Sequence, residues 1–255
     1  MKSRISLFGI TLYPYTLFMV AGAGVCMGLF VLLTLKRRKG CGDENAFAIE
    51  MLLIAIAAAL PAAIFFDALF KWGEMGAFAL RGATFYGGLL CALVLWPLLL
   101  LIKRERKVSI GERLNDLAPC IPAGHCLGRI GCFFGGCCYG CPTNSVFGVV
   151  FPEGSLPYEQ YGVSAVHPTQ LYEAALLLLI AGILFLWGKR AAFPLYLMLY
   201  GAGRFVIEFF RADDRGVLFS LPLSPAQTIS LVLIVLGEIL LILRLVRKSG
   251  GKAKL

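Results

Sequence analysis

Residues 128–140 read Gly-Arg-Ile-Gly-Cys-Phe-Phe-Gly-Gly-Cys-Cys-Tyr-Gly. This stretch places one cation, Arg129, in an otherwise uncharged run of glycine, aromatic and sulfur-containing residues. The fold class depends on whether that cation lies in water, in the core of a soluble protein or in a bilayer. The surroundings of Arg129 must therefore be inferred first, from the sequence on either side of this stretch.

The composition indicates a membrane protein. Of the 255 residues, 59% are hydrophobic and only 15% are charged, whereas a soluble domain carries about 25% charged residues. Several apolar runs reach the roughly 20 residues that a helix needs to cross a bilayer. We therefore predict an all-α, multi-pass membrane protein that forms a single domain over residues 1–255. The seven predicted spans are residues 12–35, 46–66, 83–102, 116–139, 171–187, 191–210 and 225–246.

The Lys and Arg residues in the connections predict the orientation, because cytoplasmic loops carry an excess of these residues. Sixteen of the 24 lie in segments that share one predicted side, including four in residues 36–45 and five in residues 103–115. The opposite side has six, and residues 140–170 have none. We predict an external N-terminus, a cytoplasmic C-terminus and an extracytoplasmic loop at about residues 140–170. This asymmetry explains the net charge of +9, so we expect no nucleic-acid partner.

Two arginines, Arg129 and Arg204, fall inside predicted spans, where an arginine costs about 2.5–3.5 kcal/mol on insertion scales. Glu208 lies at i+4 from Arg204 on the same helix face, so an internal ion pair is one explanation. That pair leaves Arg129 without a partner. Two guanidinium groups aimed at one polar cavity suit a phosphate or carboxylate. We interpret them as a site for the phosphate of a lipid head group.

Other polar residues reach the same outer half of the predicted membrane. His167, in the outer loop, is the titratable base that we favour, since an unperturbed histidine has a pKa near 6.5. His125 is left unassigned, because a lone histidine in a helix is more often a packing residue. Glu173 lies just inside a span and needs a partner. The tyrosines at positions 15, 172 and 200 also fit an interfacial aromatic belt.

Four of the nine cysteines are close in sequence, namely Cys132, Cys137, Cys138 and Cys141. Three interpretations stay open: a disulfide at an oxidising outer surface, a redox relay that uses the Cys138-x-x-Cys141 pair, or small residues packing near glycines. A zinc site is disfavoured, because such sites use two separated cysteine pairs or histidine ligands. We predict no metal and no cofactor.

Five segments, spread through most of the chain, add a more specific signal. Residues 128–140 are similar to the signature G-R-x-G-N-F-x-N-x-E-x-x-G, and residues 167–173, His-Pro-Thr-Gln-Leu-Tyr-Glu, to H-P-S-Q-L-Y-E. Residues 200–211, Tyr-Gly-Ala-Gly-Arg-Phe-Val-Ile-Glu-Phe-Phe-Arg, are similar to Y-G-x-x-R-F-x-x-E-F-F-R. Residues 85–89, Phe-Tyr-Gly-Gly-Leu, are similar to F-H-G-G-L, and residues 12–15 to a first-span segment. Through these motifs the chain resembles the prolipoprotein diacylglyceryl transferase family.

The resemblance implies an enzyme of the bacterial cytoplasmic (inner) membrane that moves a diacylglyceryl group from phosphatidylglycerol onto the lipobox cysteine thiol of a prolipoprotein. Its expected partners are phosphatidylglycerol, the prolipoprotein signal peptide and membrane lipids, and we expect a monomer. Arg129 and Arg204 would hold the phosphate and stabilise the leaving glycerol phosphate. The resemblance implies catalytic roles for Arg129, Arg204, His167, Tyr86 and Tyr15, and substrate-binding roles for Tyr200, Glu208, Gly140, Gln170 and Glu173.

The chain departs from the family pattern at four positions within these motifs, and the arginine that the family commonly places in its second span is absent at Pro61-Ala-Ala. Tyr86 replaces a histidine, and tyrosine is a poor base at neutral pH because its ordinary pKa is near 10. Cys132 and Gly135 replace asparagines, and Cys137 replaces a glutamate. Alternatives therefore stay open: a membrane thiol–disulfide oxidoreductase that uses the four clustered cysteines, a relative that acts on a different thiol or lipid acceptor, or a non-catalytic lipid-binding relative.

Overall fold

The structure is a computed structural model, and it describes residues 5–7, 10–12, 14–37, 110–188, 191–212 and 223–252. The predicted spans at residues 46–66 and 83–102 lie outside these ranges, as does Tyr86. The chain divides into two compact units, Met1–Phe30 with Ile110–Leu255, and Val31–Ser109. Almost all described residues belong to the first unit.

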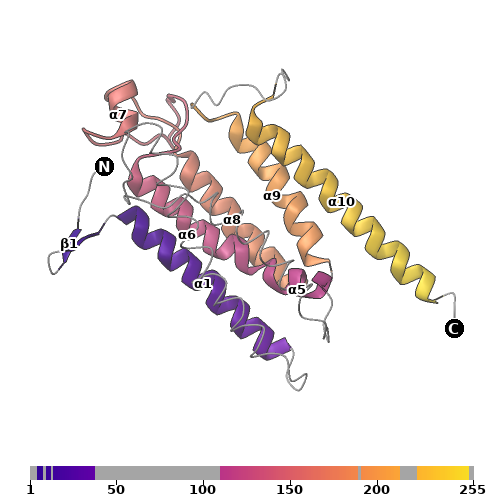
Figure 1. The fold of residues 1–255 in the computed structure, drawn as a ribbon. Coiled ribbons are helices and arrows are strands. Elements are labelled where there is room, and N and C mark those ends of the chain that lie inside the picture. The colour runs from indigo at the N-terminus through magenta and orange to yellow at the C-terminus, as the bar shows by residue number, and fades with distance from the viewer. Residues whose placement is uncertain are drawn as a thin grey trace, which may run out of the picture. The chain divides into compact units, whose positions relative to one another are not determined.

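The first unit is mostly helical (Figure 1). Two short antiparallel strands, β1 (Ile5–Leu7) and β2 (Ile10–Leu12), precede the helices. They correct the all-α prediction at residues 5–7 and 10–12. The helices are α1 (Pro14–Arg37), α5 (Ile110–Leu117), α6 (Cys120–Gly135), α7 (Leu156–Tyr161), α8 (Thr169–Trp187), α9 (Ala192–Glu208) and α10 (Pro225–Lys252).

Proline and glycine set the ends of α6, and both ends differ from the single span predicted at residues 116–139. Pro119 separates α5 from α6, because a proline inside a helix removes a backbone donor and clashes with the preceding turn. Gly136 ends α6 in the left-handed conformation, with φ 67° and ψ 26°, as glycine commonly does after a helix. Cys137 and Cys138 consequently lie in the loop that follows α6.

The helices pack in the order α6, α8, α9 and α10, each against the next. Figure 1 shows these four helices side by side, with α10 flanking α9. Between α5, α8 and α9 lies a buried apolar core that includes Ile180, Leu184 and Leu197. Small residues bring helices into close contact, as in many membrane proteins: a Cβ on Gly22 of α1 would meet the carbonyl oxygen of Gly124 in α6.

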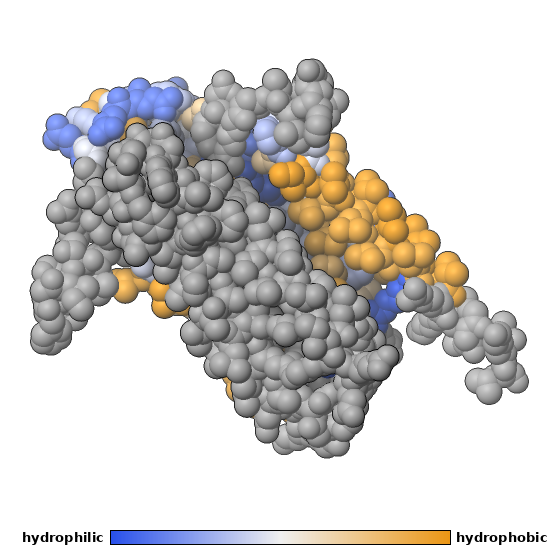
Figure 2. All heavy atoms as spheres, viewed as in Figure 1, coloured by the Kyte–Doolittle hydropathy of each residue, from blue (hydrophilic) through white to orange (hydrophobic). Residues whose placement is uncertain are grey.

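Three described helices are long and apolar enough to cross a membrane, at Pro14–Lys36, Thr169–Trp187 and Pro225–Val246. Apolar side chains cover the outward face of α10, where Val232, Val235 and Ile239 are exposed (Figure 2). A continuous exposed apolar face of this kind suits contact with lipid. The prediction of a largely helical membrane protein is thus confirmed.

Candidate functional site

Helices α6, α8 and α9 bring four charged side chains together. Glu173 of α8 is fully buried, and Arg204 and Glu208 of α9 are buried beside it. Arg129 of α6 keeps 17% of its side chain exposed. Because a buried charge is costly unless it is paired, the contacts among these residues decide how the site is built.

Glu173 lies at the centre. Its Oε1 atom is 2.9 Å from Nη2 of Arg129, and the same oxygen accepts a hydrogen bond of 3.0 Å from the Tyr200 hydroxyl. Its other oxygen, Oε2, lies 3.8 Å from Nε of Arg204. One carboxylate therefore joins the two arginines that come from different helices.

Glu208 is the second carboxylate. Its Oε2 atom lies 2.7 Å from Nη2 of Arg204 and 3.9 Å from Nε of Arg211. Its Oε1 atom accepts a hydrogen bond of 2.9 Å from the Ser224 hydroxyl, which links α9 to the residue that precedes α10. We call Arg129, Glu173, Arg204, Glu208 and Arg211 the arginine cluster.

The expectation that Arg129 has no carboxylate partner is wrong, because Glu173 pairs with it. The ion pair between Arg204 and Glu208 that was considered as an alternative is present. The five residues of the arginine cluster still carry three guanidinium groups against two carboxylates. The Nη1 atom of Arg204 is buried and has no hydrogen-bond partner within the described part of the chain. Oε2 of Glu173 and Oε2 of Glu208 are likewise buried with no hydrogen-bond partner there. The cluster thus holds both a donor and acceptors that no described group satisfies through a hydrogen bond.

His125 is a member of this site that was not assigned from the sequence. Nε of Arg129 donates a hydrogen bond of 3.3 Å to Nε2 of His125, and the His125 ring centre lies 5.7 Å from that of Tyr200. The spacing of four residues between His125 and Arg129 places both on one helix face. That spacing is the feature of the sequence from which the contact between His125 and Arg129 could have been predicted. The contact fixes His125 as a hydrogen-bond acceptor that orients the guanidinium group.

Tyr15 reaches the same region from the start of α1. A Cβ on Gly131 would lie 3.2 Å from the Tyr15 carbonyl oxygen, and one on Gly135 would lie 3.8 Å from the Tyr15 side chain. Tyr15 is also close enough to Arg129 and Cys132 to interact with them electrostatically. The structure therefore brings Tyr15 beside the end of α6, and its predicted catalytic role stays a prediction.

His167 lies in the loop before α8 and has well-defined partners. Its Nδ1 atom is 3.0 Å from the Tyr172 hydroxyl, and its ring packs edge-on against Phe210. These hydrogen-bond and ring contacts of His167 within the described ranges do not include an arginine of the cluster. Its predicted role as a base therefore stays a prediction.

Gly140 lies where two loops meet. Its amide donates a hydrogen bond of 2.8 Å to the His167 carbonyl oxygen, and it forms an isolated β-bridge with Arg211. A Cβ at this position would meet the carbonyl oxygen of Phe210 and would lie 2.7 Å from Cβ of His167. Gly140 therefore allows close packing of the backbone, and its predicted role in substrate binding stays a prediction.

We expect Gly140→Ala to lower the free energy of unfolding by about 1–3 kcal/mol, because an inserted methyl group in a packed site displaces its neighbours. Thermal unfolding in detergent measures the effect. Gly182→Ala is the matched control, since a Cβ on Gly182 has no described neighbour within 4 Å and alanine is favoured over glycine inside a helix by about 0.5–1 kcal/mol. Equal melting of the two variants would contradict the assignment.

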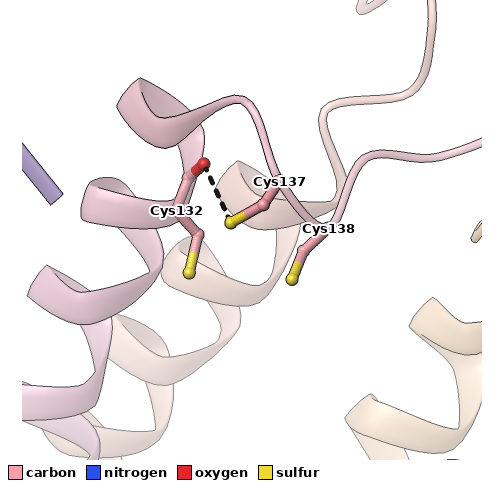
Figure 3. A group of neighbouring side chains, drawn as sticks. All are labelled: Cys132, Cys137 and Cys138. Carbon is pink, nitrogen blue, oxygen red and sulfur yellow. Dashed lines mark hydrogen bonds between the residues drawn. The ribbon is translucent and has the colours of Figure 1, made fainter. Parts of the chain in front are cut away.

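Three of the four clustered cysteines come together where α6 ends (Figure 3). The sulfur atoms of Cys132, Cys137 and Cys138 all lie within 4.8 Å of one another. The Cys137 thiol donates a hydrogen bond of 3.7 Å to the Cys132 carbonyl oxygen. Cys141 is directed elsewhere, since its thiol donates to the Arg211 carbonyl oxygen at 3.2 Å. The seven described cysteines all have free thiols, so the disulfide interpretation is not supported for them.

Two residues at the start of α8 fix the loop that carries these cysteines. The Thr169 hydroxyl donates to the Cys138 carbonyl oxygen at 2.6 Å, and Nε2 of Gln170 donates to the Cys137 carbonyl oxygen at 2.6 Å. Gln170 thus supports the loop, and its predicted role in substrate binding stays a prediction. Cys138 has φ 63°, a conformation that is uncommon for a residue with a Cβ.

The environment of the loop alters the Cys138 thiol. Hydrogen bonds from Cys132 and Cys137 hold the pKa of Cys138 well below its ordinary value. A hydrogen bond from the Arg211 guanidinium group has a smaller effect in the same direction. These neighbours therefore favour the ionised form of Cys138 over the neutral thiol. Through Arg211 the cysteines are also connected to the arginine cluster.

Comparison with known proteins supports the resemblance. A family model for prolipoprotein diacylglyceryl transferase matches residues 3–243. A phosphatidylglycerol–prolipoprotein diacylglyceryl transferase of Clostridium tetani is 31% identical over 245 residues, which cover 91% of this chain and 92% of the relative. A second such transferase, of Clostridium perfringens, is 29% identical over 92% of this chain and 91% of its own length. That of Chlorobaculum tepidum is 36% identical over 62% of this chain and 54% of its own length.

Proposed function

Because the chain belongs to the prolipoprotein diacylglyceryl transferase family, we propose that it transfers a diacylglyceryl group from phosphatidylglycerol to the lipobox cysteine thiol of a prolipoprotein. In this reaction a carbon–sulfur bond forms and the bond between the diacylglyceryl carbon and the phosphate oxygen breaks. The electron pair of that bond leaves with glycerol phosphate. The site must therefore stabilise an anion inside a membrane protein.

The arginine cluster is the observation that carries this proposal. Arg129, which shares the Glu173 carboxylate with Arg204, is partly exposed, and Nη1 of Arg204 is buried with no hydrogen-bond partner in the described ranges. A phosphate oxygen would satisfy that donor, and arginine binds phosphate through two parallel hydrogen bonds. Fixed donors that face developing charge are a large source of transition-state stabilisation.

The remaining residues support this arrangement. Tyr200 and Glu173 hold Arg129 and Arg204 in place, and Glu208 ties Arg204 to Arg211. Tyr15 would contact the head group from α1, and His167 would take the proton of the acceptor thiol. We also propose the single-domain, seven-span arrangement with an external N-terminus in the bacterial inner membrane, since the distribution of Lys and Arg favours it.

The proposal is tested with the full-length protein in vesicles that contain phosphatidylglycerol with labelled acyl chains. We expect label to move to a synthetic lipobox peptide, and no label to move when serine replaces the peptide's cysteine or when phosphatidylethanolamine replaces the lipid. Rescue of a strain depleted of its own transferase gives an independent readout. Labelling of neither the lipobox peptide nor any other thiol acceptor would contradict the proposal.

The thiol–disulfide oxidoreductase alternative has less support. Its simplest form pairs Cys138 with Cys141, but the Cys141 thiol donates to the Arg211 carbonyl oxygen. The three cysteines that do come together are Cys132, Cys137 and Cys138. A disulfide uses two sulfur atoms, so a group of three suggests a different chemistry.

A further inference from the structure

Cys132, Cys137 and Cys138 are not explained by phosphate binding. Cys132 and Cys137 replace an asparagine and a glutamate of the family signature where α6 ends, and the backbone there is specially shaped. The left-handed Gly136 reverses the chain, and Cys138 itself has φ 63°. Backbone strain of this kind is found at functional sites, where the surrounding structure must hold it. Here the holding contacts are those of Thr169 and Gln170.

We propose that Cys132, Cys137 and Cys138 form a binding site for a single thiophilic metal ion, with Zn²⁺ as the expected ion. Three sulfur ligands that each lie about 2.3 Å from one zinc ion are about 3.8–4.0 Å apart. The three sulfur atoms already lie within 4.8 Å of one another. Each sulfur–sulfur separation therefore needs to shorten by no more than about 1 Å to match that spacing.

The chemistry of the donors fits such an ion. Thiolates select Zn²⁺ and Cu⁺ over hard cations such as Mg²⁺. Three thiolates and one Zn²⁺ carry a net charge of −1. The Arg211 guanidinium group that hydrogen-bonds to the Cys138 sulfur compensates for it, and Arg129 is near enough to Cys132 and Cys138 to contribute. The site is thus balanced by cations that are already present.

The sequence argued against a metal because Cys137 and Cys138 are adjacent and no second pair or histidine follows at the usual spacing. The structure shows why that spacing misleads. The turn at Gly136 returns the chain toward the last turn of α6, so that Cys132 becomes the third donor. Three donors from one short segment then replace the two separated pairs of a structural zinc site.

A site with three protein ligands leaves one position open, as catalytic zinc sites do. This extension rests on the proposed function: the open position takes the acceptor thiol, which loses its proton to water on binding, because a thiol that coordinates a metal is deprotonated. Its sulfur then attacks the diacylglyceryl carbon while glycerol phosphate leaves. The metal site would supply the activation that the histidine-to-tyrosine replacement at Tyr86 removes.

The site is tested by adding Co²⁺ to the reduced, full-length protein in detergent. We expect sulfur-to-cobalt charge-transfer absorption at one Co²⁺ per chain, displaced by Zn²⁺. Separate replacement of Cys132, Cys137 or Cys138 by serine should weaken binding by more than about 100-fold, the upper end of the loss caused by removing an outer-shell partner. Cys141→Ser is the matched control, since its sulfur lies outside the group of three, and should bind Co²⁺ like the unmodified protein.

Several results would overturn the site. One is the absence of charge-transfer absorption when titration shows that all thiols are reduced. Another is unchanged Co²⁺ binding in the Cys138→Ser variant. Mass spectrometry that shows a disulfide among the three cysteines in protein purified without reductant, together with no bound metal, would establish a redox pair instead. Elution in gel filtration like the unmodified protein excludes misfolding as the cause of lost binding.

The transfer assay separates this inference from the proposed function. Removal of Zn²⁺ by a chelator should slow labelling of the lipobox peptide, and added Zn²⁺ should restore it. Labelling that proceeds unchanged in the metal-free protein would overturn the activation of the acceptor while leaving the transferase intact. Cobalt binding by a protein that labels neither the lipobox peptide nor any other thiol acceptor would leave the metal site intact and refute the transferase.

Discussion

Replacement of Glu173 by glutamine is expected to destabilise the protein by about 3–5 kcal/mol and to abolish transfer, because it breaks a buried ion pair by removing one partner. The Glu173 side chain is only 1% exposed, and it contacts Arg129, Arg204 and Tyr200. Glutamine keeps the shape and can still accept from Tyr200, but it leaves the neighbouring guanidinium charges without compensation. Thermal unfolding in detergent measures the loss.

The matched control is Glu159→Gln in α7, where the side chain is exposed. A surface substitution away from buried contacts changes the free energy of unfolding by less than about 0.5 kcal/mol. A Glu173→Gln variant that melts together with Glu159→Gln would show that Glu173 is not the partner of the two arginines.

A double variant separates charge from packing. In Arg129→Met with Glu173→Leu both partners of the 2.9 Å pair are replaced by apolar groups, and replacing a buried pair in this way is often neutral or stabilising. We expect this variant to be more stable than Glu173→Gln and equally inactive. That result would show that the lost stability of Glu173→Gln comes from uncompensated charge.

The apolar helices could be predicted from the sequence because their signal is local. The predicted spans 171–187 and 191–210 correspond to α8 (Thr169–Trp187) and α9 (Ala192–Glu208), with ends that differ by two residues or fewer. The predicted span 225–246 begins with α10 at Pro225, and the helix continues to Lys252. Length and apolar character alone determine these elements, since a bilayer-spanning helix satisfies its own backbone.

The segment at residues 116–139 was predicted less well, because a glycine in such a segment can have either of two structural roles. Within a membrane a glycine can pack helices closely, as Gly124 does, or it can end a helix, as Gly136 does. Which of these two roles a glycine has depends on the segments that pack against it in the folded protein. The helix end at Gly136 is also what brings the three cysteines together, so their grouping could not be predicted from their spacing.

The site residues were identified from motifs, but their pairing was not. The i+4 spacing correctly predicted the contact between Arg204 and Glu208. The partner of Arg129 is Glu173, which is 44 positions away in α8 and meets it only because α6 and α8 pack together. This pairing changes how the two arginines are interpreted, because both already have carboxylate partners before any ligand binds. They belong to a network that is held rigid before a ligand binds.

That network leads to the second large effect. We expect Arg129→Ala to abolish labelling of the lipobox peptide while costing less stability than Glu173→Gln. Arg129 has 17% of its side chain exposed, whereas Arg204 has 7%, so Arg129 is the more accessible of the two to a lipid phosphate. Its removal leaves Glu173 with Arg204 at 3.8 Å and with the Tyr200 hydroxyl. The carboxylate therefore keeps a cation and a hydrogen bond.

Arg129→Lys distinguishes charge from geometry. Lysine keeps the positive charge beside Glu173 but lacks the planar fork that binds phosphate through two hydrogen bonds. We expect transfer to fall by about 10²–10³-fold, as when one donor to a developing anion is lost, with a melting temperature close to that of the unmodified protein. Arg244→Lys on the exposed side of α10 is the control and should label the peptide normally. If Arg129→Lys melts like the unmodified protein and still labels the peptide normally, the phosphate is bound elsewhere than at Arg129.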